Sequence, residues 1–488
     1  MRRPFALTDG TDSVVATLFV RGLGVVFAIA FASLLVQVVG LFGTHGISPL
    51  ADHLALARER LGADAALHFP SWLWLCGAGD AALRGACLAG IACSLLVAAG
   101  RVPRSALFGA WSLYLSFCSL GQPFLSYQWD LLLLETGLVG MFVATPGSRL
   151  GLWLARALCF KLMLLSGIVK LRSGDPTWRD LSAMSYHFWT QPLPAWPAVF
   201  AAALPAWTQA ALTFATLAIE LVAPLASFGP RRARLIAAAL LAALQLGIAA
   251  TGTYGFFNLL SLLLCLALLD DAALPARLRA LLEPPRAAPP VVHLARVRLG
   301  LHVALASFVL AASAAIALDR VGRVPEVVEV VLAKIAPLRS INSYGLFAVM
   351  TTDRREIALE GSADGVHWKR YEFSWKPGAL DRRPRFATPH MPRLDWQMWF
   401  AALGRCERQG WLHAFLQRVL EGRPEVLELL ALNPFPDRPP RYVRTPQARY
   451  RFAALADVWR GTWWRSEPLE DYCPELELRG GNLLRVGR

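Results

Sequence analysis

The sequence predicts a polytopic α-helical membrane protein of about nine spans with a C-terminal α+β extracytoplasmic domain. Of its 488 residues 55% are hydrophobic and only 17% are charged, against a usual quarter, which excludes disorder and disulfide-rich miniproteins. Across positions 14–318 the apolar residues fall in runs of about 17–30, a length suited to crossing a bilayer. Beyond position 318 the charges become dense, and turn-bounded segments replace the long apolar runs.

Nine apolar segments are candidate spans. They are 14–41, 81–99, 105–121, 129–145, 150–170, 206–228, 234–251, 254–270 and 299–318. The first is too long for a cleaved signal peptide and lacks a small-residue cleavage site, so we expect it to remain a span. The chain then divides into a multi-span transmembrane domain, 1–318, with outer loops 42–80 and 171–205, and a soluble outer domain, 319–488, large enough for its own core.

Basic residues predict the orientation. A net charge of +14 would suggest nucleic acid in a soluble protein, but the short basic loops all fall on one side when the N-terminus is inside. The predicted inner loops hold Arg2, Arg3, Arg101, Arg104, Arg149, Arg231, Arg232, Arg234, Arg277, Arg279, Arg286, Arg296 and Arg298, and the outer loops hold Arg58, Arg60, Lys170, Arg172 and Arg179. We therefore expect the C-terminal domain outside and no nucleic-acid partner, although an error of one span would invert this. Composition favours a bacterial cytoplasmic membrane.

The two outer loops are aromatic. The first contains Phe69, Trp72 and Trp74, and the second contains Trp178, Tyr186, His187, Phe188, Trp189 and Trp196. Because Trp and Tyr settle at the headgroup level, these loops are interpreted as lying on the outer membrane surface. A lid or platform for a partner protein is the alternative.

Ionisable residues inside spans are costly and therefore informative. They are Arg21, Asp130, Glu135, Arg156, Lys161 and Glu220. Glu135 lies six residues after Trp129, hence about 9 Å deeper at 1.5 Å per residue, and the next span returns Lys161 to a comparable depth. We expect a Glu135–Lys161 pair, which is interpreted as structural. A proton relay, or Lys161 acting as a desolvated base, is the alternative.

Sequence motifs typical of soluble enzymes are nearly absent. No P-loop, dinucleotide fingerprint, HExxH or GxSxG stands in a credible setting, and no Cys/His spacing resembles a metal site, so no cofactor and no metal are predicted. Of eight cysteines, Cys406 and Cys473 alone fall in the outer domain. An oxidising compartment would allow them to form a disulfide, and the sequence leaves both outcomes open.

The outer domain is predicted to mix strands and helices. Residues 356–360 and 367–375 alternate as strands across an Asp-Gly turn, 394–421 and 424–432 are predicted helices, and 441–453 is strand-like. Eight of the seventeen tryptophans lie here: 368, 375, 396, 399, 411, 459, 463 and 464. Trp and Arg together are typical of protein-binding hot spots, so an outward-facing binding surface is weighed against simple core packing.

Several segments resemble a known family. They are Ser126–Asp130 with Glu135, Lys161–Lys170, Met184–Phe188 with Thr190–Pro194, Tyr254–Asn258, Ile341–Thr352, Glu360–Ser362, Pro389–Phe400, Asn433–Phe435 and Tyr472. Together they resemble the lipase maturation factor family over about 14–478. The runs Leu394–Phe400 and Tyr186–Pro194 are the more specific.

The resemblance implies a membrane protein that helps secreted clients reach their active fold. In eukaryotic members the membrane is that of the endoplasmic reticulum and the clients are dimeric lipases. The client-binding or family-motif residues would be Tyr127, Trp129, Asp130, Tyr186, His187, Asn342, Tyr344, Asp395, Trp396 and Trp399. Partners would be membrane lipid and secreted clients, with the oligomeric state open.

An enzymatic or transport function is the alternative. The membrane core also resembles, more distantly, the vitamin K-dependent carboxylase group. That likeness keeps Glu135, Lys161, Lys170 and His187 as candidates for a membrane enzyme or a proton-coupled transporter, although no catalytic set is evident.

Overall fold

The computed structural model describes residues 13–145, 150–282, 292–319, 322 and 324–486. Part of the predicted orientation pattern lies outside them, namely Arg2, Arg3, Arg149 and Arg286, as do the side chains of Arg296 and Arg298.

Each of the nine predicted spans contains a helix. These are α1 (Ser13–Leu35), α6 (Asp80–Ala98), α7 (Pro103–Leu120), α8 (Gln128–Val143), α9 (Leu150–Arg172), α13 (Ala206–Val222), α14 (Arg231–Thr251), α15 (Phe257–Leu266) and α17 (Val292–Asp319). Among the described residues, six segments are long and apolar enough to cross a membrane, and they correspond to α1, α6, α9, α13 with its continuation to Phe228, α14 and α17. The prediction of a multi-span membrane protein with a C-terminal domain is confirmed, but the count of nine spans is not.

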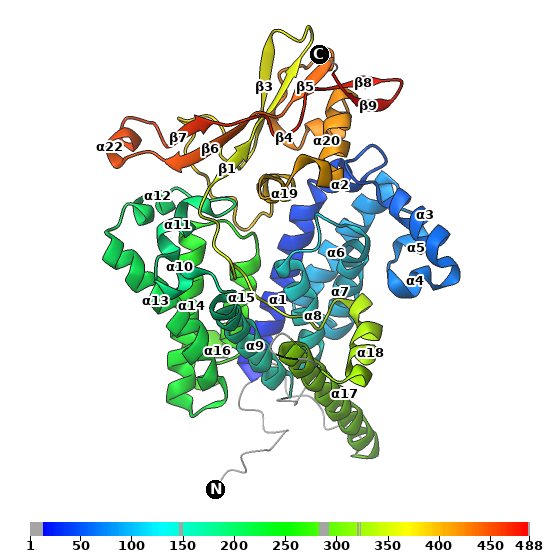
Figure 1. Ribbon diagram of the computed structural model, residues 1–488. Helices are drawn as coiled ribbons and strands as arrows, with labels where there is room; N and C mark the ends of the chain where they lie inside the picture. Colours follow the sequence, from blue (N-terminus) through cyan, green and yellow to red (C-terminus); the bar gives the residue numbers. More distant parts are fainter. Residues whose placement is uncertain (1–12, 146–149, 283–291, 320–321, 323, 487–488) are drawn as a thin grey trace.

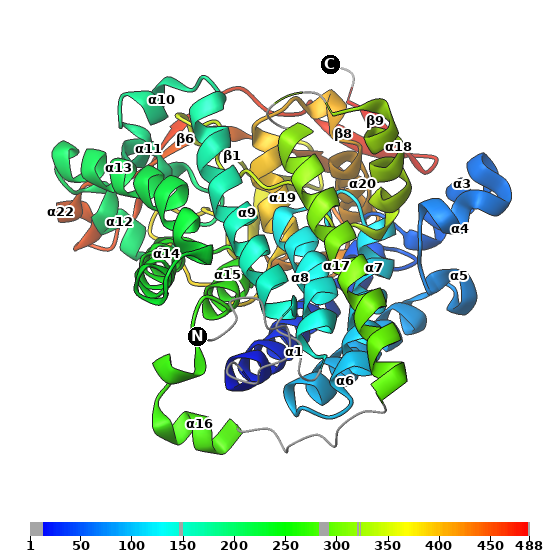
Figure 2. The same ribbon diagram turned by 90° about the horizontal axis from the view of Figure 1, so that it is seen from below.

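The helices differ in how much protein surrounds them. Viewed from below, α8 and α9 lie near the centre, with α6 and α14 farther out (Figure 2). Two-thirds of the apolar window of α9 is buried (67%), against 17% for α17, and 12 of the 16 residues of α8 are buried. An interior helix can be short and carry acidic side chains because protein rather than lipid surrounds it.

Short helices build the two outer loops. The first contains α2 (Val38–Phe42), α3 (Leu50–Leu61), η1 (Gly62–Asp64), α4 (Ala65–His68) and α5 (Leu73–Cys76), and the second contains α10 (Pro176–Arg179), α11 (Ala183–Thr190) and α12 (Pro197–Ala202). Between the later spans lie η2 (Ala223–Phe228), η3 (Asp271–Ala273) and α16 (Ala276–Leu282). Both loops lie towards the C-terminal strands, whereas α16 lies at the opposite end (Figure 1).

Two antiparallel sheets form the C-terminal domain. One has the order β4-β3-β2-β5-β8-β9 and the other β1-β6-β7. The strands are β1 (Arg355–Ile357), β2 (Leu359–Ser362), β3 (Trp368–Phe373), β4 (Leu430–Leu432), β5 (Tyr442–Arg444), β6 (Gln447–Phe452), β7 (Trp464–Pro468), β8 (Leu476–Arg479) and β9 (Asn482–Arg485). The helical elements are α18 (Glu326–Ile335), η4 (Ala336–Leu338), α19 (Arg393–Ala402), η5 (Cys406–Arg408), α20 (Gly410–Leu420), α21 (Pro424–Leu427) and α22 (Leu455–Val458).

The predicted hairpin is present in this domain. β2 pairs with β3 in a register that places Leu359 opposite Tyr371. At the turn, the Asp364 carboxylate accepts the backbone N–H groups of Val366 and His367 at 2.9 and 2.8 Å, and Gly365 takes a φ of +78°. Glycine suits this left-handed conformation because it has no Cβ to clash.

Other predicted elements were wrong. The helix expected over 394–421 breaks into α19 and α20, and that expected over 424–432 ends at Leu427, where the chain turns into β4 and pairs with β3. Strands β7, β8 and β9 were not predicted. A continuous cluster of buried apolar side chains runs from Val15 on α1 to Leu476 on β8, so the C-terminal domain packs directly on the helices.

Candidate functional site

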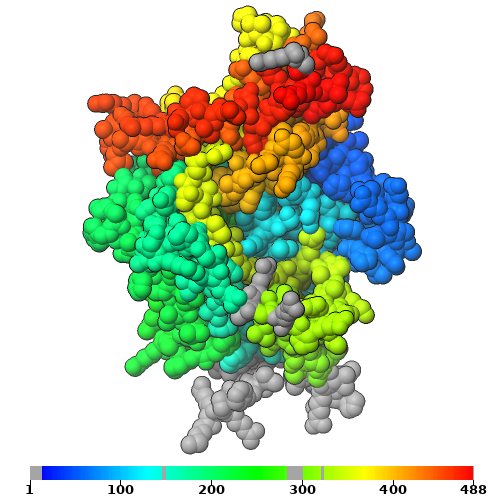
Figure 3. All heavy atoms as spheres, in the orientation of Figure 1, coloured from blue at the N-terminus to red at the C-terminus, as the bar shows by residue number. Residues whose placement is uncertain are grey.

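The C-terminal domain contacts the helices through the segments 339–350 and 389–400. Figure 3 shows the later part of the C-terminal domain, coloured orange to red, as a layer over the helical part. Most of the predicted site residues lie beneath this layer. We call the contact region the interdomain junction.

Arg393, the first residue of α19, forms the central ion pair of the junction. Its Nη2 and Nη1 donate to the two carboxylate oxygens of Asp130 at 2.8 and 3.0 Å, and Nη1 also donates to the Phe124 carbonyl at 2.6 Å. Tyr114 donates its hydroxyl to Asp130 Oδ1 at 2.5 Å. Both charged side chains are buried. Bidentate charge-assisted hydrogen bonds of this kind fix the relative orientation of the two side chains and stabilise their contact.

The end of α1 holds the residues just before α19. Gln37 donates from Nε2 to the Met391 carbonyl at 2.9 Å, and its Oε1 accepts the Arg393 N–H at 2.9 Å. Ser33 Oγ accepts the Met391 N–H at 2.9 Å and lies 2.9 Å from His390 Nδ1. Burial, together with the Arg393 charge, lowers the pKa of His390 to about 4, so its ring is neutral near pH 7.

Glu135 and Lys161 form the buried ion pair expected between successive spans. The other oxygen of Glu135, Oε2, accepts the backbone N–H of Asn342 at 3.0 Å and the hydroxyl of Tyr344 at 2.6 Å. Lys161 also donates to Ser313 on α17 at 3.2 Å. Both carboxylate oxygens are thus engaged, which favours the structural role over a proton relay or a base.

Aromatic rings fill the junction around these polar contacts. The Tyr127 and Trp129 rings stack with centroids 4.6 Å apart, and the Trp129 and Trp396 rings meet edge-on at 4.7 Å. The Trp399 indole donates to the Thr190 carbonyl at 2.9 Å. Trp396 is 3% exposed and Trp399 8%. These two side chains therefore pack against the helices and the second outer loop, which favours, for both of them, core packing over an outward-facing binding surface.

Asp395 is also buried and orders its own domain. Its Oδ1 accepts the backbone N–H groups of Trp375 and Lys376 at 2.7 and 2.9 Å. Removal from water raises the pKa of this carboxyl, and the two backbone bonds act in the opposite direction. Asp395 therefore fixes the chain that follows β3.

A buried charge network that was not predicted links β1 to the second outer loop. Arg354 donates to the carbonyls of Gln191 and, at 2.8 Å, Pro192. Glu356 lies 2.6 Å from Arg354 Nη2 and 2.7 Å from Lys376 Nζ. The sequence does not distinguish Arg354 from the many other arginines of this domain. The carbonyl groups that accept its hydrogen bonds belong to residues more than 150 positions earlier.

A second buried pair lies beside His187 and Tyr186. Lys170 Nζ lies 2.8 Å from each oxygen of Glu220. Desolvation, and secondarily the charge of Lys170, lowers the pKa of His187 to about 4. His187 Nε2 lies 3.5 Å from the Tyr254 hydroxyl. Tyr186 is half-buried on α11, with its ring 6.3 Å from that of Trp189. The pairs Glu135–Lys161 and Lys170–Glu220 are thus separate sites.

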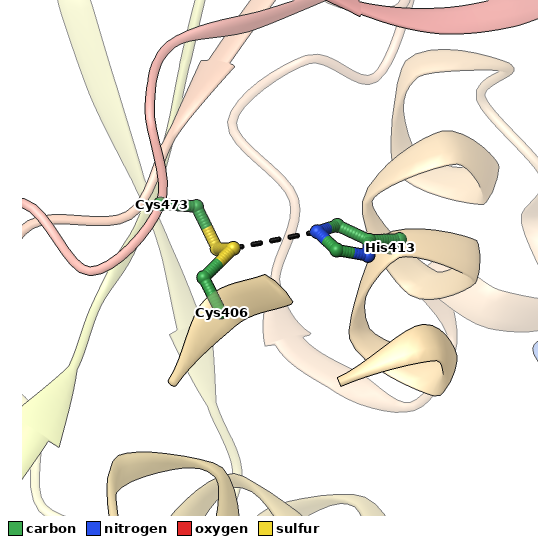
Figure 4. Close-up of side chains that lie close together, drawn as sticks. All are labelled: Cys406, His413 and Cys473. Carbon is green, nitrogen blue, oxygen red and sulfur yellow. Dashed lines mark hydrogen bonds between the residues drawn. A yellow bond between two sulfur atoms is a disulfide. The ribbon is translucent and has the colours of Figure 1, made fainter. Parts of the chain in front are cut away.

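Cys406 and Cys473 form a disulfide with their Cα atoms 5.4 Å apart. His413 Nε2 lies 3.3 Å from Cys406 Sγ, and Figure 4 shows its ring pointing at the bridge. The three side chains place their potential metal-ligand atoms within 4.8 Å of one another. Since the two sulfurs are bonded to each other, neither is the thiolate that a zinc site requires.

Aromatic rings gather where the second outer loop meets the C-terminal domain; Phe386 and Trp459 are exposed, and Trp196, Phe200 and Trp463 are half-buried. Trp459, just after α22, lies 5.9 Å from the Phe200 ring of α12. The Arg383 guanidinium lies 4.6 Å from the Trp196 ring and 5.6 Å from the Trp463 ring. Phe386 lies 6.4 Å from Trp196. We call Trp196, Phe200, Arg383, Phe386, Trp459 and Trp463 the aromatic surface.

Comparison with known proteins identifies the family. Residues 14–276 match the family described as lipase maturation factor transmembrane domain, and residues 340–474 match the lipase maturation factor C-terminal domain. The chain belongs to the lipase maturation factor family. This confirms the family resemblance found in the sequence.

Members of the lipase maturation factor family from vertebrates align with nearly the whole chain. Lipase maturation factor 2 of Homo sapiens is 34% identical over 94% of this chain and 82% of its own length. Lipase maturation factor 1 of Bos taurus is 33% identical over 98% of this chain and 92% of its own length. No solved structure matches significantly. The interdomain junction joins the two matched domains of the lipase maturation factor family.

Proposed function

We propose that this protein is a membrane-embedded maturation factor that helps secreted clients, lipases among them, to fold and assemble. Membership of the lipase maturation factor family over both domains is the observation that carries the proposal. The relatives are named for lipase maturation. Both carboxylate oxygens of Asp130 and both of Glu135 accept hydrogen bonds within the junction, which supports a binding scaffold rather than an enzyme.

The proposed location is a bacterial cytoplasmic membrane with the N-terminus inside and the C-terminal domain outside. The arginine-rich inner loops support this orientation. It is also supported by the two long loops, which lie towards the C-terminal strands, while α16 with Arg277 and Arg279 lies at the other end (Figure 1). A client leaving the export machinery would then meet the C-terminal domain.

The aromatic surface is the proposed client-binding face. Trp459 is 76% exposed and Phe386 42%, and Arg383 is exposed. Exposed aromatic and arginine side chains in contact with one another are typical of binding hot spots. A partly folded client presents apolar segments that such a surface would cover.

Complementation tests this face. In cells that lack the gene, the Trp459→Ala variant should lower secreted lipase activity by about tenfold, the effect of about 1.4 kcal/mol of lost binding. Trp207→Ala is the matched control, because Trp207 is 74% exposed but lies at the start of the membrane-spanning helix α13. Variant abundance is measured alongside activity.

Proteomics of exported proteins then separates the outcomes. Deletion of the gene should deplete specific secreted proteins, and wild type but not Trp459→Ala should restore them. If exported proteins are unchanged on deletion, the maturation function is wrong. If deletion depletes clients and Trp459→Ala restores them fully, the function stands and the aromatic surface is not the client site.

A further inference from the structure

A cavity of about 400 Å³ lies among α9, α11, α13 and α14. Figure 1 shows α9, α13 and α14 below α11, which belongs to the second outer loop. Most of the wall is apolar, including Leu162, Met163, Ile219 and Ile248. Its volume falls within the usual range for small-molecule sites, about 300–1,000 Å³.

The wall includes residues on the outer faces of α13 and α14. Leu212 of α13 and Ala243 and Gly247 of α14 line the cavity and are exposed. Both helices are candidate membrane spans, so these faces adjoin lipid hydrocarbon. A Cβ added at Gly247 would meet no atom within 4 Å, which shows open space beside this residue.

Polar side chains in the wall include Lys170, Glu220, His187 and Tyr254, together with Ser166, Thr216, Gln245 and Thr251. Lys170 and Glu220 neutralise each other across two bonds of 2.8 Å. The depressed pKa of His187 keeps its ring uncharged at neutral pH. Tyr254 donates its hydroxyl to Gln191 Oε1 at 2.8 Å. The 3.5 Å contact between His187 Nε2 and the Tyr254 oxygen is at the limit of hydrogen bonding, which leaves His187 Nε2 with capacity for another partner. The cavity thus combines a hydrocarbon-compatible wall with uncharged hydrogen-bonding groups.

We propose that this cavity binds an acyl chain of a membrane lipid, with the ester group of that lipid beside His187 and Tyr254. A free fatty-acid anion fits less well, because the nearby cation already has its carboxylate and a buried unpaired charge is costly. A client peptide also fits less well, because its backbone N–H and C=O groups would lack partners among the apolar walls. The acyl chain enters from the bilayer between α13 and α14.

Photolabelling of the full-length protein in mild detergent tests this site. The probe is a phosphatidylcholine with a diazirine near the end of one acyl chain, and labelled residues are mapped by peptide mass spectrometry. In the wild type, labelling should concentrate on the cavity-lining residues of α13 and α14. Gly247→Phe fills the open space and should reduce that labelling by about tenfold. Gly85→Phe is the control, because Gly85 is an exposed helical glycine on α6 whose added Cβ also meets no atom within 4 Å.

Three outcomes overturn the proposal. They are labelling of the cavity no stronger than that of the exposed faces of α6 and α17, unchanged labelling in Gly247→Phe, and stronger protection by free palmitic acid than by unlabelled phosphatidylcholine. If Gly247→Phe does not elute as a folded, monodisperse species, Ala243→Phe, one turn earlier in the same wall, takes its place. Competition by unlabelled phosphatidylcholine in the wild type gives a readout that needs no variant: loss of cavity labelling supports the site, and persistence rejects it.

Discussion

Arg393 and Asp130 form a two-bond ion pair, with Nη2–Oδ1 at 2.8 Å and Nη1–Oδ2 at 3.0 Å, across 263 residues of sequence. Both side chains are essentially shielded from solvent. A buried charge that loses its partner is strongly unfavourable. The pair therefore couples the folding of the C-terminal domain to that of α8.

Removal of Arg393 should destabilise the protein. We expect Arg393→Met to lower the free energy of unfolding by about 3–5 kcal/mol, because it leaves Asp130 charged and buried. Adding Asp130→Leu should recover part of this loss, since the uncompensated charge is then gone. Thermal unfolding in detergent measures both variants. Arg460→Met is the control, with its side chain 80% exposed; an Arg393→Met curve that coincides with it would contradict the prediction.

The charges of the Glu135–Lys161 pair should not be required for activity. The double variant Glu135→Gln with Lys161→Met keeps an oxygen acceptor for Asn342 and Tyr344 and removes both charges. We expect near wild-type secreted lipase activity in complementation, whereas Lys161→Met alone should cost about 3–5 kcal/mol of stability. Normal folding of the double variant with complete loss of activity would favour the enzyme or proton-relay alternative.

Stability should fall in mild acid. His187 and His390 each have a folded pKa of about 4, against an ordinary value of 6.5, and burial is the main cause. As the pH falls below 6.5 the unfolded state takes up protons first, so the stabilisation present above pH 6.5 is lost progressively towards pH 4. Each histidine contributes at most about 1.4 kcal/mol per pH unit. Chemical unfolding across this range should show a smaller acid loss for His390→Gln than for wild type, while exposed His45→Gln should match wild type; equal slopes in all three would refute this.

Local geometry made part of the junction predictable. Glu135 and Lys161 lie on successive antiparallel helices. The rise of 1.5 Å per residue therefore predicted that both side chains lie at a similar depth in the membrane. Arg393, which pairs with Asp130, and the two groups that donate to Glu135 Oε2 come from segments more than 200 residues later. Periodicity within a span carries no information on such contacts.

The tryptophans were harder to interpret. Trp396 and Trp399 resemble exposed hot-spot residues by type and by their arginine-rich surroundings, but the opposite wall that buries them is formed by Trp129 and Thr190. Strands β7 to β9 are short and charged, and they are held by antiparallel pairing with other strands rather than by a clear apolar alternation. These features depend on tertiary contact.

The bonds from Asn342 and Tyr344 to Glu135 have a consequence for the order of biogenesis. The ribosome adds residues 342 and 344 only after it has completed the described membrane helices, of which α17 is the last. Until then Glu135 Oε2 lacks the backbone N–H of Asn342 and the hydroxyl of Tyr344 as donors. The helical part therefore gains these two hydrogen bonds only after the C-terminal segment has been synthesised and has packed against it. A chain that ends before position 340 would therefore lack both of these donors and would leave Glu135 Oε2 without them.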